Sequence, residues 1–120
     1  MKRGVILFAH GSRDPQWRRP MEAVAARVAA REPGVAVRCT YLELTEPDLS
    51  AVAADFAGQG LAQVTIVPMF LGAGRHVRED LPALVEGLRA AHPGVGWVLQ
   101  PPVGEDGRLL DLLATLALDS

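Results

Sequence analysis

Two histidines stand where buried strands are expected to end. His10 follows the apolar run of residues 5–9, and His76 closes a glycine-containing stretch after the apolar run of residues 64–69. Neutral imidazole binds transition metals and accepts protons near neutral pH. Because α/β proteins place their chemistry at the carboxyl ends of strands, we expect the two histidines to flank one crevice. The alternative for each histidine is a cap or a hydrogen bond to a neighbouring backbone group.

One carboxylate could complete this set of donors. Glu43 follows a second expected strand, residues 35–42, and therefore lies at the same edge of the sheet. Two imidazoles and one carboxylate form an N/O ligand set that suits Fe, Co, Ni or Zn. The sequence thus predicts a metal-binding group made of His10, His76 and Glu43.

Small residues accompany the histidines in both loops. Gly11, Gly72 and Gly74 would let backbone amides approach a ligand and let the chain take positive φ values. The alternative is ordinary turn chemistry. The chain contains neither G-x-G-x-x-G nor G-x-x-x-x-G-K-[ST], so nothing supports nucleotide binding of those types. Ser12 is not in a G-x-S-x-G motif, and a serine hydrolase is therefore not predicted.

Positive charge gathers around the same loops. Arg13, Arg75 and Arg78 could pair the carboxylates of an acidic ligand. Helices expected to begin near Asp14 and near Val77 would point their positive ends into the crevice, which also favours an anion. Ordinary solvated arginines are the alternative.

Strands and helices are expected to alternate four times along one domain, residues 1–120. The predicted strands are residues 5–9, 35–42, 64–68 and 95–99, and helices follow each of them, the third at residues 77–91 and the last at about 109–116. Such alternation predicts an α/β fold with a parallel sheet and helices on both faces. We expect the strand order 2-1-3-4, although alternation alone does not fix that order. The second strand alternates in polarity, which suggests an edge position. Pro20 predicts that the regular part of the first helix begins not far before it, and Pro82 predicts an irregular first turn in the third helix.

Composition excludes several classes of protein. A net charge of −2 argues against a general nucleic-acid binder. The single cysteine, Cys39, cannot form an internal disulfide, which fits a reducing cytoplasm. No apolar run approaches the roughly 20 residues of a membrane span, and the amino-terminal run is too short for a signal peptide. We expect a cytoplasmic protein with no membrane or nucleic-acid partner.

These motifs together resemble the short CbiX/SirB-type sirohydrochlorin chelatases of the class II chelatase family. The resemblance rests on residues 9–13 (AHGSR), on residues 41–43 (YLE) with Pro47 following, and on residues 68–81 (PMFLGAGRHVREDL). It implies insertion of Co²⁺, Fe²⁺ or Ni²⁺ into sirohydrochlorin, a tetrapyrrole of cobalamin and siroheme biosynthesis, with the ion as a substrate and no permanently bound cofactor.

The resemblance also implies a flavodoxin-like α/β fold and roles for individual residues. His10, His76 and Glu43 would be catalytic, one holding the ion and another accepting pyrrole protons, although the sequence does not decide which histidine does which. The predicted substrate-binding residues are Gly11, Ser12, Arg13, Gly72, Gly74, Arg75 and Arg78.

Two further points follow from the resemblance. Long family members have two lobes, so this one-lobed chain is expected to form a homodimer. The leucine-rich last helix could belong to that contact, or it could be buried on its own sheet. The alternatives to an enzyme are a non-catalytic carrier of metal or tetrapyrrole and an interaction module of the same fold.

Overall fold

The computed structural model describes residues 2–119, so the two terminal residues of the predicted domain lie outside it. Its centre is a four-stranded parallel sheet with the order β2-β1-β3-β4. The strands are β1 (Arg3–Ala9), β2 (Ala36–Tyr41), β3 (Gln63–Pro68) and β4 (Gly96–Leu99). The predicted order and the edge position of β2 are both confirmed.

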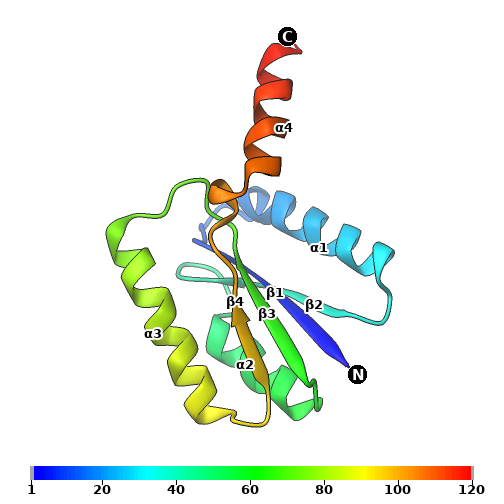
Figure 1. Cartoon of the computed structure of the whole chain (residues 1–120), viewed down its shortest axis with the longest axis vertical. Coiled ribbons are helices and arrows are strands. Elements are labelled where there is room, and N and C mark those ends of the chain that lie inside the picture. The colour runs from blue at the N-terminus through cyan, green and yellow to red at the C-terminus, as the bar shows by residue number, and fades with distance from the viewer. Residues whose placement is uncertain (1, 120) are drawn as a thin grey trace.

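Helices connect the strands and follow the last of them (Figure 1). They are α1 (Arg19–Arg31), α2 (Leu49–Gly58), α3 (Arg75–Ala91) and α4 (Gly107–Leu118), with short 3₁₀ turns η1 (Pro15–Arg18) and η2 (Val103–Glu105). Within residues 2–119, no helix combines the length and the apolar character that crossing a membrane requires.

The start of the regular first helix just before Pro20 is confirmed, whereas the third helix differs from its prediction. The Asp14 carboxylate caps only the 3₁₀ turn η1, by accepting a hydrogen bond from the Gln16 amide at 2.9 Å, and the α-helix begins later, at Arg19. Proline favours the first positions of a helix, so Pro20 sets that later start. Helix α3 begins at Arg75, and the prediction of an irregular first turn was wrong, since the helix runs unbroken through Pro82. Its buried face, which includes Leu81 and Val85, anchors it on both sides of the proline.

The hydrophobic core lies on one face of the sheet, between the strands and helices α2 and α3. Because successive strand residues point to opposite faces, Ile6 and Phe8 of β1 share this side with Val64 and Ile66 of β3. The core consists of Ile6, Phe8, Leu49, Val52, Ala53, Phe56, Leu61, Val64, Ile66, Phe70, Leu81, Val85, Leu88 and Trp97.

The opposite face of the sheet is covered over only part of its width. Helix α1 packs on β2 and β1, and none of its residues is fully buried. Right-handed crossovers explain this, because the β1–β2 connection runs in one direction across the sheet and the later connections run in the other. Helices α2 and α3 therefore share one face, and α1 is alone on the other.

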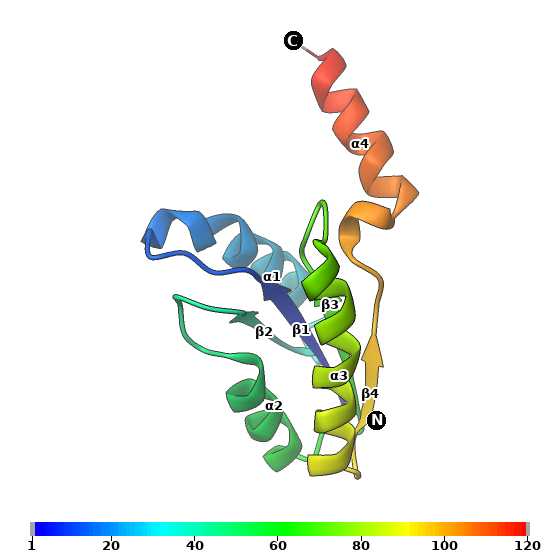
Figure 2. The same ribbon diagram turned by 90° about the vertical axis from the view of Figure 1, so that its left-hand side faces the viewer.

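Helix α4 does not fill the remaining space. Figures 1 and 2 both show it projecting beyond the rest of the molecule. Among residues 2–119, the only element it contacts extensively is η2, the turn that precedes it. Burial of the leucine-rich helix on its own sheet, one of the two explanations considered above, does not occur in this structure.

Thr40 gives a test of the packing between β2 and α2. Its side chain is fully buried, and its hydroxyl has no hydrogen-bond partner. Since an unpartnered buried hydroxyl costs free energy, we expect Thr40→Val to raise the free energy of unfolding by about 1 kcal/mol. Urea unfolding of the two proteins measures the difference. A less stable valine variant would show that the hydroxyl is satisfied in solution.

Candidate functional site

The loops that follow β1 and β2 are joined through their backbones. The Glu43 amide donates to the His10 carbonyl at 2.9 Å, which extends the strand pairing beyond the sheet. Gly11 has a φ of +103°, and a Cβ atom there would lie 1.8 Å from the Glu43 carbonyl oxygen. The positive φ predicted for Gly11 is confirmed, and only glycine allows this approach.

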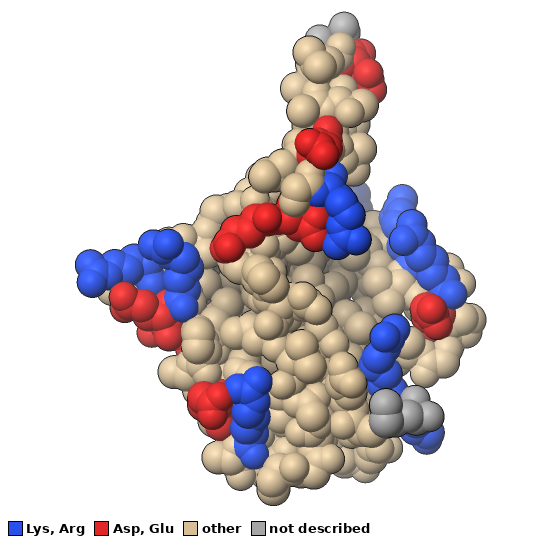
Figure 3. Space-filling model, viewed as in Figure 1, with Lys and Arg blue, Asp and Glu red and all other residues tan. Residues whose placement is uncertain are grey.

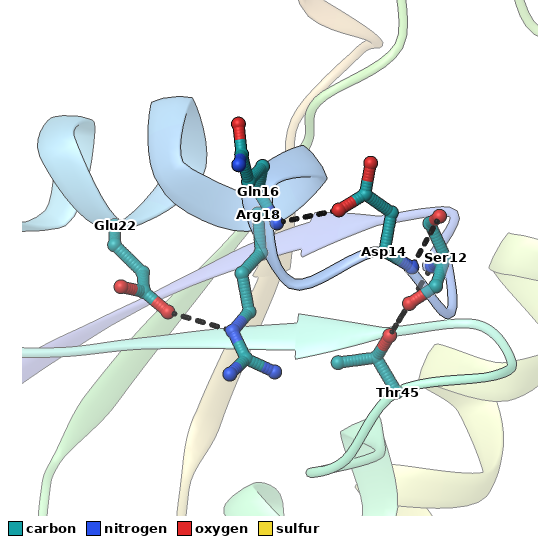
Figure 4. Close-up of polar contacts among 6 residues, drawn as sticks. All are labelled: Ser12, Asp14, Gln16, Arg18, Glu22 and Thr45. Carbon is teal, nitrogen blue, oxygen red and sulfur yellow. Dashed lines mark hydrogen bonds and ion pairs between the residues drawn. The ribbon is translucent and has the colours of Figure 1, made fainter.

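Side-chain hydrogen bonds fix the same loop (Figure 4). The Thr45 hydroxyl accepts from the Ser12 amide at 3.2 Å and donates to the Ser12 carbonyl. The Ser12 hydroxyl accepts from the Asp14 amide at 3.1 Å. Thr45 was not singled out in the sequence, because nothing in its neighbourhood there indicates a partner 33 residues away.

Phe70 brings the loops after β1 and β3 together. The His10 ring lies 4.6 Å from the Phe70 ring, between ring centroids, at an angle of 58°. Phe70 is buried and meets Phe8 edge-on at 6.0 Å, so the core holds the surface on which His10 rests. The imidazole itself is exposed, which leaves it available to a ligand. Phe70 was not predicted to be a site residue. Its position between the apolar run of residues 64–69 and the glycines of the following loop could have indicated that it supports the site.

His76 lies in the first turn of a helix rather than in a loop. Gly74 is the N-cap of α3, and His76 is the second residue of that helix and exposed. The positive φ predicted for Gly72 and Gly74 was wrong, since neither has one. Gly74 has φ −64° and ψ 163°, the extended conformation that any N-cap residue can adopt. A Cβ atom at either glycine would meet nothing within 4 Å, so the space beside this loop is open.

A segment that was not predicted to take part supports the same loop. The Gly104 amide in η2 donates to the Phe70 carbonyl at 2.9 Å. A Cβ atom at Gly104 would lie 1.6 Å from the Leu71 carbonyl oxygen, so the two backbones are in direct contact. The turn before α4 therefore sets the path of the chain that leads to His76.

The three predicted arginines are exposed and differ in what they contact. Arg75 forms an ion pair with Glu79, one turn along α3, at 3.1 Å. Because both side chains are exposed, this pair contributes little to the stability of the fold. Arg78 borders a depression of about 360 Å³ together with Ala73 and Glu105. Arg13 lies in the loop after β1, and no ion pair involving it occurs within the described residues.

The three predicted metal ligands share one edge of the sheet without forming a cluster of side chains. His10 and Glu43 come from joined loops, and His76 stands beyond Phe70 at the start of α3. Within residues 2–119, no three side chains of the types His, Cys, Asp and Glu are grouped closely enough to hold an ion. The roles of the three residues remain predictions.

Beneath this edge, Tyr41 is buried between β2 and the start of α1. Its ring lies 6.2 Å from that of Trp17, and its exposed fraction is 3%. The pKa of Tyr41 is raised to about 12, mainly by burial and to a smaller extent by the neighbouring Cys39 and Glu22, against the opposing effect of Arg18. Burial also raises the pKa of the Cys39 thiol, which keeps it protonated and unreactive at neutral pH.

The chain resembles known proteins along almost its whole length. Residues 4–119 match the model of the CbiX family. A sirohydrochlorin cobaltochelatase of Methanococcoides burtonii is 33% identical over 85 residues, which are 71% of this chain and 65% of that protein. The match thus spans just under two thirds of this relative.

Solved structures agree with the observed fold. A CbiX protein from Marinobacter aquaeolei VT8 superposes with a TM-score of 0.83 at 38% identity, covering 98% of this chain and 95% of that one. The sirohydrochlorin chelatase SirB of Bacillus subtilis subspecies spizizenii, in complex with cobalt, has a TM-score of 0.81 at 22% identity over 51% of its chain. At that identity the second likeness shows the fold alone.

The close contact at Gly11 can be tested by adding one methyl group. Gly11→Ala places a Cβ against the Glu43 carbonyl at a positive φ, and we expect it to lower the free energy of unfolding by at least about 1–3 kcal/mol. Gly87→Ala is the control, since Gly87 lies inside α3 with free space around it, and alanine there should add about 0.5–1 kcal/mol. Equal stability of the two variants in urea would contradict the contact.

Tyr41 predicts a loss of stability in alkali. A tyrosine whose pKa is raised in the folded state favours folding below its unfolded pKa, near 10, and that contribution is lost as the pH rises through about 12. We expect up to about 2–3 kcal/mol of unfolding free energy to disappear over this range and the loss to be much smaller in Tyr41→Phe. Tyr41 is the only tyrosine, so tyrosinate absorbance follows its titration directly. Ionisation near pH 10 in the folded protein would contradict its burial.

Proposed function

Because the chain belongs to the CbiX family, we propose that it is a chelatase that inserts a divalent ion, Co²⁺, Fe²⁺ or Ni²⁺, into sirohydrochlorin. The observation that carries the proposal is the contact of His10 with Phe70, which joins the loop after β1 to the loop that leads to His76. Relatives named sirohydrochlorin cobaltochelatase support the reaction and the substrate. A chloroplastic sirohydrochlorin ferrochelatase of Arabidopsis thaliana supports Fe²⁺ among the ions considered.

Metal insertion needs a ligand for the ion and an acceptor for protons. The divalent ion exchanges water for macrocycle nitrogens, and the macrocycle releases two pyrrole protons, so the charges balance. In the proposal one imidazole, of His10 or His76, holds the ion through its nitrogen lone pair. The other imidazole or the Glu43 carboxylate takes up a proton. Phe70 limits the orientations of the His10 ring, which lowers the cost of holding the ion in one position.

The macrocycle would be held by charge and by open space. Arg13 and Arg78 would pair its peripheral carboxylates, and Arg75 would have to leave Glu79 in order to join them. The positive end of α3 attracts the same groups. Since a Cβ atom at Gly72 or Gly74 would meet nothing, a flat ligand could approach the backbone there.

The proposal includes a homodimer. The chain forms one lobe, and the exposed leucines of α4 support a contact with a further protein surface.

Chelation is tested by mixing the protein with sirohydrochlorin and each ion and following absorbance over many turnovers. We expect insertion faster than in the absence of protein, and a rate that falls in acid because protonated imidazole binds no metal. His76→Ala should reduce the rate about 100-fold or more if the imidazole acts as a base or ligand. His92→Ala is the control, because this third histidine lies at the opposite end of α3.

Three results would count against the proposal in different ways. If no ion enters faster than without protein, the chain is not a chelatase for these ions. Uptake that stops at one ion or one tetrapyrrole per chain would indicate the carrier considered above. An unchanged rate in His76→Ala would reject the role of that residue alone.

A further inference from the structure

The loop after β2 contains a strained turn beside one of the predicted site residues. Leu44 has a φ of +64°, and among residues 2–119 it is the only residue other than glycine with a positive φ. The Thr45 amide donates to the Glu43 carbonyl across it at 2.8 Å. A three-residue turn with this hydrogen bond and a positive φ at its centre is the rare, strained form of the γ-turn. The Cβ atom of leucine makes this conformation costly, whereas glycine adopts it freely.

The residues on both sides of Leu44 are held in place. The Glu43 amide donates to the His10 carbonyl at 2.9 Å. The Thr45 hydroxyl accepts from the Ser12 amide and donates to the Ser12 carbonyl (Figure 4). The hydrogen bonds that join the loops after β1 and β2 thus fix both ends of the turn and offset its strain.

Burial does not explain why a leucine occupies this position. The side chain of Leu44 is 55% exposed, so the hydrophobic effect returns only part of what a buried leucine would gain. Glycine or asparagine would take the same positive φ at a lower cost. A strained residue that its surroundings hold in place is typical of functional sites. We therefore looked for a ligand that this side chain would contact.

A second exposed leucine lies on the other side of the His10 loop. Leu71 is 65% exposed, and its backbone is fixed against Gly104 in η2. Because β1 lies between β2 and β3, the loops of Leu44 and Leu71 flank the loop of His10. Neighbouring strands are about 4.8 Å apart, so these two loops leave the sheet roughly 10 Å from each other. A tetrapyrrole ring can bridge such a span.

Charged groups border this apolar pair. Arg13 lies in the loop between the two leucines, and Arg75 and Arg78 lie in the first turn of α3, just after Leu71. Figure 3 shows charged side chains at the start of α3 and around η2, with uncharged surface between them, where Figure 1 places the loop from β3 to α3. A ligand suited to this edge of the sheet is flat and apolar in its middle and acidic at its rim.

We infer that Leu44 and Leu71 are substrate-contact residues, which pack against the ring of the tetrapyrrole on the two sides of His10. The inference rests on the proposed function and deepens it, because it assigns the apolar contacts that charge pairing alone does not supply. The leucines meet the ring, and the arginines meet its peripheral carboxylates. Covering both side chains removes apolar surface from water. Since both backbones are already fixed, binding needs little further ordering of the chain.

Leu44→Asn removes the apolar contact without disturbing the turn. Asparagine has nearly the shape of leucine and tolerates positive φ, so the midpoint of urea unfolding should equal or exceed that of the wild type. We expect the affinity for sirohydrochlorin, measured without metal by quenching of tryptophan fluorescence, to fall about tenfold or more. Leu71→Asn should weaken binding in the same way. Leu44→Met, which keeps an adaptable apolar side chain, should bind within about threefold of the wild type.

Leu84→Asn is the matched control, since Leu84 is 41% exposed but lies well inside α3, away from both loops. Wild-type affinity in Leu44→Asn would overturn the inference and leave the proposed function intact. A lower urea midpoint would overturn it by showing that the leucine serves the fold. Weaker self-association of this variant in light scattering would also overturn it, because a second copy would then cover Leu44. A wild-type chain that binds no sirohydrochlorin would reject the inference together with the proposed function, whereas binding without turnover would reject the enzyme alone.

Discussion

The position of β1 between β2 and β3 is the constraint on which core and site both depend. Parallel pairing on both edges aligns the carboxyl ends of three strands, so the loops after them emerge together. The same pairing turns Ile6 and Phe8 toward α2 and α3. Through Phe70, the core extends to the surface beneath His10. Core packing therefore supplies the surface on which the His10 ring rests, and hydrogen bonds between the loops hold the backbone around it.

The features that follow from periodicity and topology could be predicted from sequence. Continuous apolar runs indicated strands that are buried on both faces, and the alternating polarity of β2 indicated an edge strand. Both patterns can be read from sequence because the burial of each face determines which residue types it carries. The neighbourhood of His10 and Glu43 followed from strand order alone. The positive φ at Gly11 followed from the need for a tight turn after a buried strand.

Other features depend on contacts between distant segments, which leave no local pattern. Thr45 contacts the backbone of Ser12, and Gly104 contacts the backbone of Leu71; each partner is 33 residues away in the sequence. The type of neither residue indicates such a contact. The path of α4 is of the same kind. Its leucines allowed burial on the chain's own sheet, yet no residue of α4 is buried there, because amphipathicity carries no information about which surface a helix meets.

The two tryptophans of the chain occupy environments that make them separate optical reporters. Trp97 is 4% exposed in the core, so its fluorescence follows unfolding of the whole domain. Trp17 is 39% exposed, lies in η1 just after the loop of His10, and rests beside Tyr41. Changes in emission from Trp17 alone would therefore register rearrangement of the crevice while the fold stays intact. The wild-type sequence thus contains a means of separating local motion from loss of structure without an added label.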